Sequence, residues 1–242
     1  ELDSVSGARA YAAPVKPIAS FWQRWQRLLQ QFERGEIDRG YRIALVDGGA
    51  GSVELALAMS RRLQDTGAKL SLWCGAPKIL QGYNRGARRA VMAALQEQGI
   101  EIHLRARVVA VQPARLQCAD GVEAPFNTLF WCTGAAAAPW IAESGLATDE
   151  QGFLQVRDTL QAKDDESVFG AGDIATQVNH PRPKAGVYAV RMGPVLAHNL
   201  RAQLLNQPLQ VFRPQRRFLS LLSLGDTRAT ANRGPFSATG AW

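Results

Sequence analysis

The feature that most constrains the fold is a short apolar run that leads into a glycine-rich turn. Residues 42–46 read Arg-Ile-Ala-Leu-Val, and residues 47–52 read Asp-Gly-Gly-Ala-Gly-Ser. Apolar spacing then predicts a helix over 53–63, and a second apolar run follows at 69–73. A strand, turn, helix and strand within about thirty residues are typical of a βαβ unit with parallel strands. The chain is therefore expected to be an α/β protein built on a parallel sheet.

The next segments add a hairpin to this sheet. A helix is expected over 85–98, and residues 100–111 alternate as one strand. Ala-Asp-Gly at 119–121 predicts a tight turn inside a β-hairpin, and 128–132 form another buried strand. Helices, a parallel sheet and a hairpin layer together indicate a Rossmann-like three-layer nucleotide-binding domain.

A different set of elements is expected after residue 139. Short strands are expected at 152–156 and 167–169, followed by a long amphipathic helix over 185–205. The tail from 218 to 231 predicts a hairpin that turns at Gly225. These elements indicate part of a second domain.

The glycine-rich turn departs from the dinucleotide-binding pattern. That pattern places small residues where the backbone approaches a pyrophosphate, at positions that correspond here to Asp47, Gly49 and Ser52. The following helix N-terminus would face the phosphates. Asp47 adds a negative charge to this site. The sequence therefore leaves open whether the turn binds a dinucleotide or has lost this ability.

The sequence also leaves open which of the two nicotinamide dinucleotides, NAD or NADP, such a site would prefer. The acidic residue that grips the ribose hydroxyls belongs at the end of the second strand, where 73–75 read Trp-Cys-Gly. Arg61, Arg62 and Arg85 are candidates for holding a 2′-phosphate, and solvated helix arginines are the alternative.

Charge and composition exclude several classes of function. The net charge is +7, but the arginines are scattered in pairs, so nucleic-acid binding is not expected. Three cysteines without a C-x-x-C and three distant histidines predict neither a dithiol centre nor a metal site. No stretch approaches the roughly 18–20 apolar residues of a transmembrane segment, and a cytoplasmic protein is expected.

Four segments in order resemble one family of flavoproteins. They are 46–56, 130–134, 167–173 and 183–191. They are similar to the nicotinamide turn, the "ATG" segment, the second FAD motif and the flavin-ring segment of pyridine nucleotide-disulfide oxidoreductases and type II NADH dehydrogenases. The resemblance implies two cofactors, FAD and NAD(P)H.

The resemblance also implies cofactor-binding residues. Those expected at the dinucleotides are Gly48, Gly49, Gly51, Thr133, Gly134, Gly172, Asp173, Lys184, Ala185 and Gly186. Glu54 matches an acid near the nicotinamide and flavin, which makes it the candidate catalytic residue. From the sequence alone, Glu54 is equally a first-turn carboxylate that complements the helix dipole.

The resemblance is closest to domains associated with selenide, water dikinase, through the tails 212–220 and 240–242. These flavoproteins begin with a glycine fingerprint for the ADP half of FAD, and residues 1–40 contain nothing like it. The chain is therefore expected to be a fragment or a member that has lost half of this site. The predicted parts are a linker and helix from the end of the N-terminal FAD half (1–37), a nicotinamide-dinucleotide domain (38–143), the returning half of the FAD domain (144–212) and the start of a C-terminal interface region (213–242).

Two functions remain after these arguments. The first is a flavin-dependent oxidoreductase that passes a hydride from nicotinamide to FAD and on to a small acceptor such as a quinone, a small oxidant or a selenium compound. The second is a degenerate, non-catalytic module that binds or regulates a partner such as selenide, water dikinase. A homodimer is left open.

Overall fold

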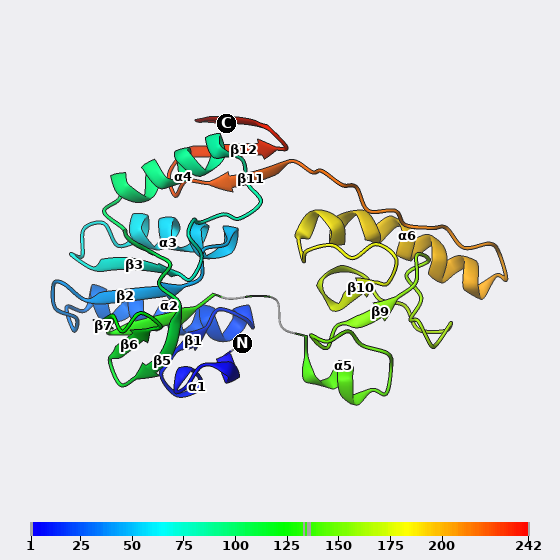
Figure 1. Ribbon diagram of the computed structural model, residues 1–242, viewed down its shortest axis with the longest axis horizontal. Coiled ribbons are helices and arrows are strands. Elements are labelled where there is room, and N and C mark those ends of the chain that lie inside the picture. The colour runs from blue at the N-terminus through cyan, green and yellow to red at the C-terminus, as the bar shows by residue number, and fades with distance from the viewer. Residues whose placement is uncertain (1, 133, 135–136, 242) are drawn as a thin grey trace. The chain divides into compact units, whose positions relative to one another are not determined.

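The chain divides into two units (Figure 1). Each unit has its own hydrophobic core. The computed structural model describes residues 2–132, 134 and 137–241. The first unit holds Glu1–Thr133 and Leu219–Trp242, and the second holds Gly134–Phe218.

A five-stranded parallel sheet forms the centre of the first unit. Its order is β1-β8-β2-β3-β4, so the first βαβ crossover joins neighbouring strands. The strands are β1 (Ala13–Pro14), β2 (Arg42–Val46), β3 (Lys69–Cys74), β4 (Glu101–Leu104) and β8 (Thr128–Trp131). The prediction of an α/β fold around a parallel sheet is confirmed.

Helices cover one face of this sheet. They are α2 (Ile18–Glu33), α3 (Ala50–Arg62) and α4 (Arg85–Glu97). Their apolar sides share a core with the sheet that includes Leu45, Leu57 and Phe130. Helix α3 begins at Ala50, before the predicted start at 53, because Gly49 already has the extended conformation of an N-cap.

A hairpin layer covers the other face, as predicted. It consists of β5 (Val108–Gln112), β6 (Arg115–Cys118) and β7 (Glu123–Pro125), which pair antiparallel in that order. The short helices η1 (Leu2–Ser4) and α1 (Ala8–Tyr11) complete this layer. The single strand predicted over 100–111 is wrong. Arg105 takes a left-handed φ of +58°, so the chain leaves the parallel sheet there and begins the hairpin layer.

A three-stranded antiparallel sheet from the C-terminal residues packs on α3 and α4. Its strands are β11 (Ser220–Ser223), β12 (Arg228–Arg233) and β13 (Phe236–Ala241). The predicted turn at Gly225 joins β11 to β12. Asn84, which caps α4, also donates to the carbonyl oxygens of Gly234 and Phe236 at 3.1 and 2.8 Å. The C-terminal sheet is thereby attached to the rest of the first unit.

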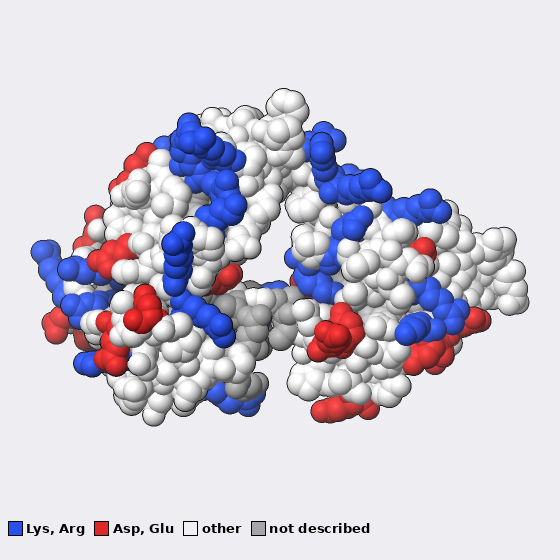
Figure 2. All heavy atoms as spheres, viewed as in Figure 1, with Lys and Arg blue, Asp and Glu red and all other residues white. Residues whose placement is uncertain are grey.

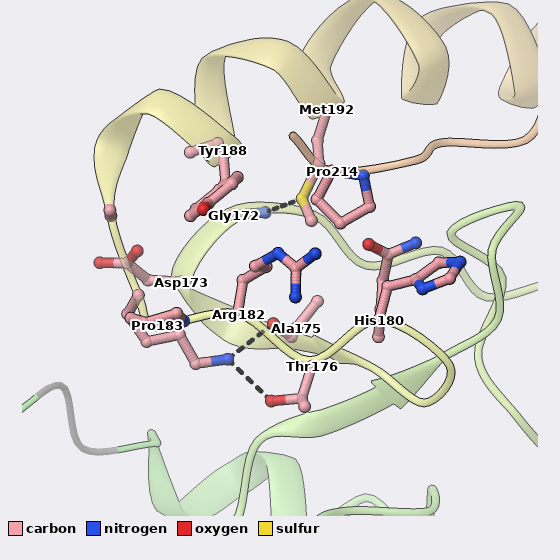
Figure 3. Close-up of a pocket in the computed structure, with 14 residues that line it drawn as sticks. Gly172, Asp173, Ala175, Thr176, His180, Arg182, Pro183, Tyr188, Met192 and Pro214 are labelled. Atoms are coloured by element: carbon pink, nitrogen blue, oxygen red, sulfur yellow. Dashed lines mark hydrogen bonds between the residues drawn. The ribbon is translucent and has the colours of Figure 1, made fainter. Parts of the chain in front are cut away.

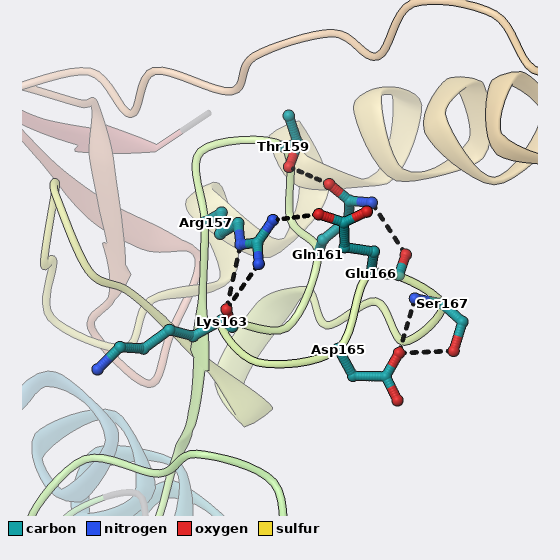
Figure 4. A network of polar contacts seen from close by, with 7 residues as sticks. All are labelled: Arg157, Thr159, Gln161, Lys163, Asp165, Glu166 and Ser167. Carbon is teal, nitrogen blue, oxygen red and sulfur yellow. Dashed lines mark hydrogen bonds and ion pairs between the residues drawn. The ribbon is translucent and has the colours of Figure 1, made fainter.

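The second unit has a small two-stranded parallel sheet and one long helix. Its elements are α5 (Pro139–Glu143), β9 (Leu154–Val156), η2 (Gly172–Ile174), β10 (Ala175–Gln177) and α6 (Gly186–Leu204). In place of the strand predicted at 167–169, the structure has one isolated antiparallel bridge between Phe169 and Gln161. Asp165 Oδ1 accepts hydrogen bonds from the backbone N–H and the hydroxyl of Ser167, which turn the chain there (Figure 4).

Replacing Gly225 by alanine is expected to destabilise the first unit more than replacing Gly121. Both glycines occupy hairpin turns, at φ +80° and +86°, so each change costs about 1–2 kcal/mol of backbone strain. A Cβ at 225 would also lie 2.7 Å from the carbonyl oxygen of Leu57, whereas none of the described atoms outside the turn lies within 4 Å of a Cβ at 121. Overpacking of this kind costs about 1–3 kcal/mol more.

Urea denaturation measures both losses. We expect the free energy of unfolding to fall about twice as far for Gly225→Ala as for Gly121→Ala. Equal losses would contradict the docking of this turn on α3.

Candidate functional site

The turn after β2 places backbone N–H groups at the carboxyl edge of the parallel sheet. Asp47 N donates to the Trp73 carbonyl at 3.0 Å, and Leu80 N donates to the Gly48 carbonyl at 2.7 Å. Gly49 then caps α3 without a side-chain hydrogen bond. The first turn of α3 therefore keeps N–H groups and a partial positive charge available to an anion.

The three glycines predicted at this turn lie in different surroundings. A Cβ on Gly48 would overlap Cys74 Sγ and lie 3.0 Å from Cys74 Cβ, so only glycine lets the turn approach β3. A Cβ on Gly49 would lie 2.9 Å from Asp47 Oδ2. A Cβ on Gly51 would have no described atom within 4 Å apart from its chain neighbours and the backbone of its own helix, which leaves space beside the helix start. Contact of the three with a cofactor stays a prediction.

Asp47 is the residue that opposes anion binding here. Its φ is +143°, a conformation that side chains rarely adopt. Its Oδ1 accepts a hydrogen bond from Gly48 N at 2.7 Å, so the carboxylate occupies one of the turn's own donors. The side chain therefore adds strain, a negative charge and a competing acceptor.

A cavity of about 480 Å³ opens beside this turn. Trp73 at the end of β3 and Trp131 at the end of β8 line it, together with Asp47, Gly75 and Arg107. The Nε1 atom of Trp131 is buried and has no hydrogen-bond partner among the described residues. Pockets of about 300–1,000 Å³ with aromatic walls and a few polar groups are typical small-molecule sites.

Sequence reasoning missed Arg107 and both tryptophans. The available signal was the position of Trp73 and Trp131 at strand ends, where parallel sheets bind ligands. The three arginines proposed from the sequence do not line the cavity. Among them, Arg61 donates to Gln64 and Arg62 pairs with Glu33 at 3.1 Å.

Glu54, the candidate catalytic acid, has a structural partner. It lies in α3, and its Oε1 accepts a hydrogen bond from Ser223 N in β11 at 2.9 Å. The carboxylate thus connects the helix of the glycine turn to the C-terminal sheet. Its catalytic role stays a prediction.

Burial makes the cysteines poor nucleophiles. It raises the pKa of Cys132 to about 12 and that of Cys118 to about 11, and it also raises the pKa of Cys74. The negative charge of Asp47 adds to the effect at Cys132 and Cys74. All three are free thiols, which stay protonated near neutral pH.

In the second unit, the predicted flavin residues gather around the start of α6 (Figure 3). Gly172 has a φ of +76°, and its N–H donates to Met192 Sδ at 3.2 Å. Asp173 and Ala185 line the same small cavity, of about 20 Å³, which is room for about one water. Ala185 caps α6 without a side-chain hydrogen bond, and none of the described atoms lies within 4 Å of a Cβ built on Gly186.

Lys184 holds the segment that leads into α6. Its Nζ donates to the Ala175 carbonyl at 2.6 Å and to Thr176 Oγ1 at 2.8 Å, and it lies 4.0 Å from the centre of the Phe153 ring. Burial lowers the pKa of Lys184, against the opposing charges of Asp149 and Asp173. The ammonium therefore anchors this segment to β10.

Two further predicted positions adjoin the connection between the units. Thr133 lies outside the described residues. Gly134 is described and takes a φ of +50°. Their cofactor contacts stay predictions.

Basic side chains on the visible face form separate groups with acidic ones between them (Figure 2). Within the described ranges, no three His, Cys, Asp or Glu residues are grouped to hold a metal ion. Of the helices that the structure describes, none combines the length and apolarity needed to cross a membrane.

Relatives of known name share most of this chain. It is 28% identical over 203 residues to the type II NADH:quinone oxidoreductase of Haemophilus influenzae, covering 76% of this chain and 45% of that protein. It is 25% identical over 175 residues to a demethylphylloquinone reductase of Synechocystis, covering 71% and 43%. The chain thus spans less than half the length of these relatives.

Solved structures show the same fold. NDH2 from Plasmodium falciparum in complex with NADH matches 99% of this chain and 68% of its own, with a TM-score of 0.80 and 12% identity. The sulfide:quinone oxidoreductase of Aquifex aeolicus matches 99% and 62%, with a TM-score of 0.77 and 16% identity. The family model described as pyridine nucleotide-disulphide oxidoreductase matches residues 5–193. Because this family model matches more than half of the chain, the chain belongs to the pyridine nucleotide-disulphide oxidoreductases.

Proposed function

We propose that the intact protein is a flavin-dependent NAD(P)H oxidoreductase with a quinone-type or other small acceptor. The observation that carries this proposal is the start of α3, whose N-cap Gly49 offers no side-chain hydrogen bond, beside a cavity of about 480 Å³ at the carboxyl edge of the sheet. When bound, the nicotinamide supplies a hydride and FAD transmits its electron pair to the acceptor. The names of the relatives from Haemophilus influenzae and Synechocystis support a quinone as that acceptor.

The chain's own residues would bind and orient the nicotinamide cofactor. The first-turn N–H groups of α3 suit a pyrophosphate, and the space beside Gly51 admits it. Trp73 and Trp131 would exclude water from two sides.

The second unit would hold the flavin from one side. The flavin would be contacted by Gly172 and Asp173, which precede β10. It would also meet the start of α6, which lacks a side-chain cap, at Lys184, Ala185 and Gly186. A cavity of about 20 Å³ is far too small for a flavin, so most of that site belongs to residues outside this unit. The division of the chain into the parts 1–37, 38–143, 144–212 and 213–242 stays a proposal.

A second candidate function rests on Asp47. Its carboxylate takes up the Gly48 N–H and adds charge where a pyrophosphate would lie. A module with a disabled dinucleotide site that binds or regulates a partner, such as selenide, water dikinase, would tolerate this residue.

The visible absorption spectrum of the full-length gene product separates the two functions. An oxidoreductase is expected to purify with the visible absorption band of oxidised flavin, and NADH or NADPH is expected to bleach this band. A colourless full-length protein that stays colourless after incubation with FAD would support the module instead.

Asp47→Gly is expected to strengthen NAD(P)H binding and to stabilise the fold. Removing a like charge near a phosphate is worth about 1 kcal/mol, or about fivefold in Kd. Releasing the strained φ, less the lost hydrogen bond, adds about 1 kcal/mol to the free energy of unfolding.

Asp47→Asn is the matched control. It keeps an acceptor for Gly48 N and the strained backbone but removes the charge, so we expect tighter binding without added stability. Fluorescence titration and urea denaturation measure the two quantities. Unchanged Kd values in both variants would contradict a role for this charge.

Glu54→Ala is expected to lower the free energy of unfolding by about 1 kcal/mol, because Ser223 N loses its acceptor. Glu54→Gln keeps an acceptor and should retain stability. The same pair tests the catalytic prediction: that prediction requires Glu54→Gln to slow NAD(P)H oxidation at unchanged melting temperature. An equal stability loss in both variants would contradict the hydrogen bond to β11.

A further inference from the structure

We propose that the cavity beside the glycine turn selects a dinucleotide with a 2′-phosphate, NADPH over NADH, and that Arg107 determines this selectivity. The inference rests on the proposed function, because it assigns the nicotinamide cofactor of the same site. It concerns the end of β3, where dinucleotide folds distinguish a ribose 2′-hydroxyl from a 2′-phosphate.

The backbone fixes Arg107 at the end of β3. Ala106 N donates to the Cys74 carbonyl at 3.0 Å, and Arg105 N donates to the Ala76 carbonyl at 2.9 Å. A Cβ on Gly75 would lie 3.4 Å from both the Cα and the Cβ of Arg107. The segment that carries Arg107 is therefore packed directly against the strand end and does not depend on a mobile loop for its position.

The charges at the strand end favour a phosphate over a hydroxyl. A 2′-hydroxyl is normally held by a carboxylate, but residues 74–79 read Cys-Gly-Ala-Pro-Lys-Ile and contain none. The carboxylate that lines the cavity, Asp47, follows β2 instead. Arg107 lines the cavity at the β3 side, and a guanidinium binds phosphate through paired N–H donors.

The guanidinium of Arg107 is available for a ligand. Its side chain is exposed and has no hydrogen bond or ion pair with any described residue. Arg62 differs in this respect, because it is paired with Glu33. Arg105 is anchored by the same backbone contacts but does not line the cavity. These observations single out Arg107 among the arginines near β3.

Adenosine 2′,5′-bisphosphate and adenosine 5′-monophosphate test the proposal, because they differ only in the 2′-phosphate. Isothermal titration of the full-length protein is expected to give a Kd about tenfold or more lower for the bisphosphate, as one charge-assisted contact provides. Arg107→Gln should bring the two Kd values within about threefold by weakening the bisphosphate alone. NADPH and NADH should show the same change.

Arg89→Gln is the matched control, since Arg89 is exposed on α4 and does not line the cavity. It should keep the wild-type selectivity, and Arg107→Lys should keep part of it. If the wild-type protein binds both nucleotides equally, or if Arg107→Gln leaves the selectivity unchanged, the assignment to Arg107 is overturned and the proposed function stands. If neither nucleotide nor NAD(P)H binds, both are overturned.

Discussion

The close approach of Gly48 to Cys74 is the contact on which the first unit's site depends. It lets the chain leave β2 against the end of β3, so that Gly49 can begin α3 at once. The Asp47 N–H then continues the ladder to the Trp73 carbonyl. Because a side chain at 48 would push the turn away from the sheet, the direction of α3 and the wall of the cavity both follow from this one missing Cβ.

Asp47 shows how one residue can fit the fold and still work against its site. The position needs a backbone that glycine adopts without cost, and aspartate adopts it with its own carboxylate bonded to Gly48 N. That bond compensates part of the strain. The same geometry fixes the negative charge of Asp47 beside the start of α3. The carboxylate therefore satisfies a backbone N–H group but also repels an anion that would bind there.

The sequence predicted those elements whose formation depends on residues close together in the chain. The βαβ unit, the hairpin at 119–121 and the turn at Gly225 all follow from apolar spacing and turn residues, and the structure confirms them. The failures have tertiary causes. Arg105 divides the segment 100–111 between two layers because its backbone bonds to the end of β3, and alternation alone cannot show such a partner. Arg107 was missed for the same reason.

The three thiols of this chain are held in their protonated form by burial and by neighbouring charge. A disulfide relay needs a thiolate, but burial raises the pKa of Cys74 and Cys132, and the charge of Asp47 raises both further. At neutral pH these groups stay protonated, and the sequence offers no C-x-x-C pair. The carboxylate that weakens the anion site thus also suppresses thiol chemistry beside it. The three cysteines of this chain are therefore protonated thiols near neutral pH and are not suited to a disulfide relay among themselves.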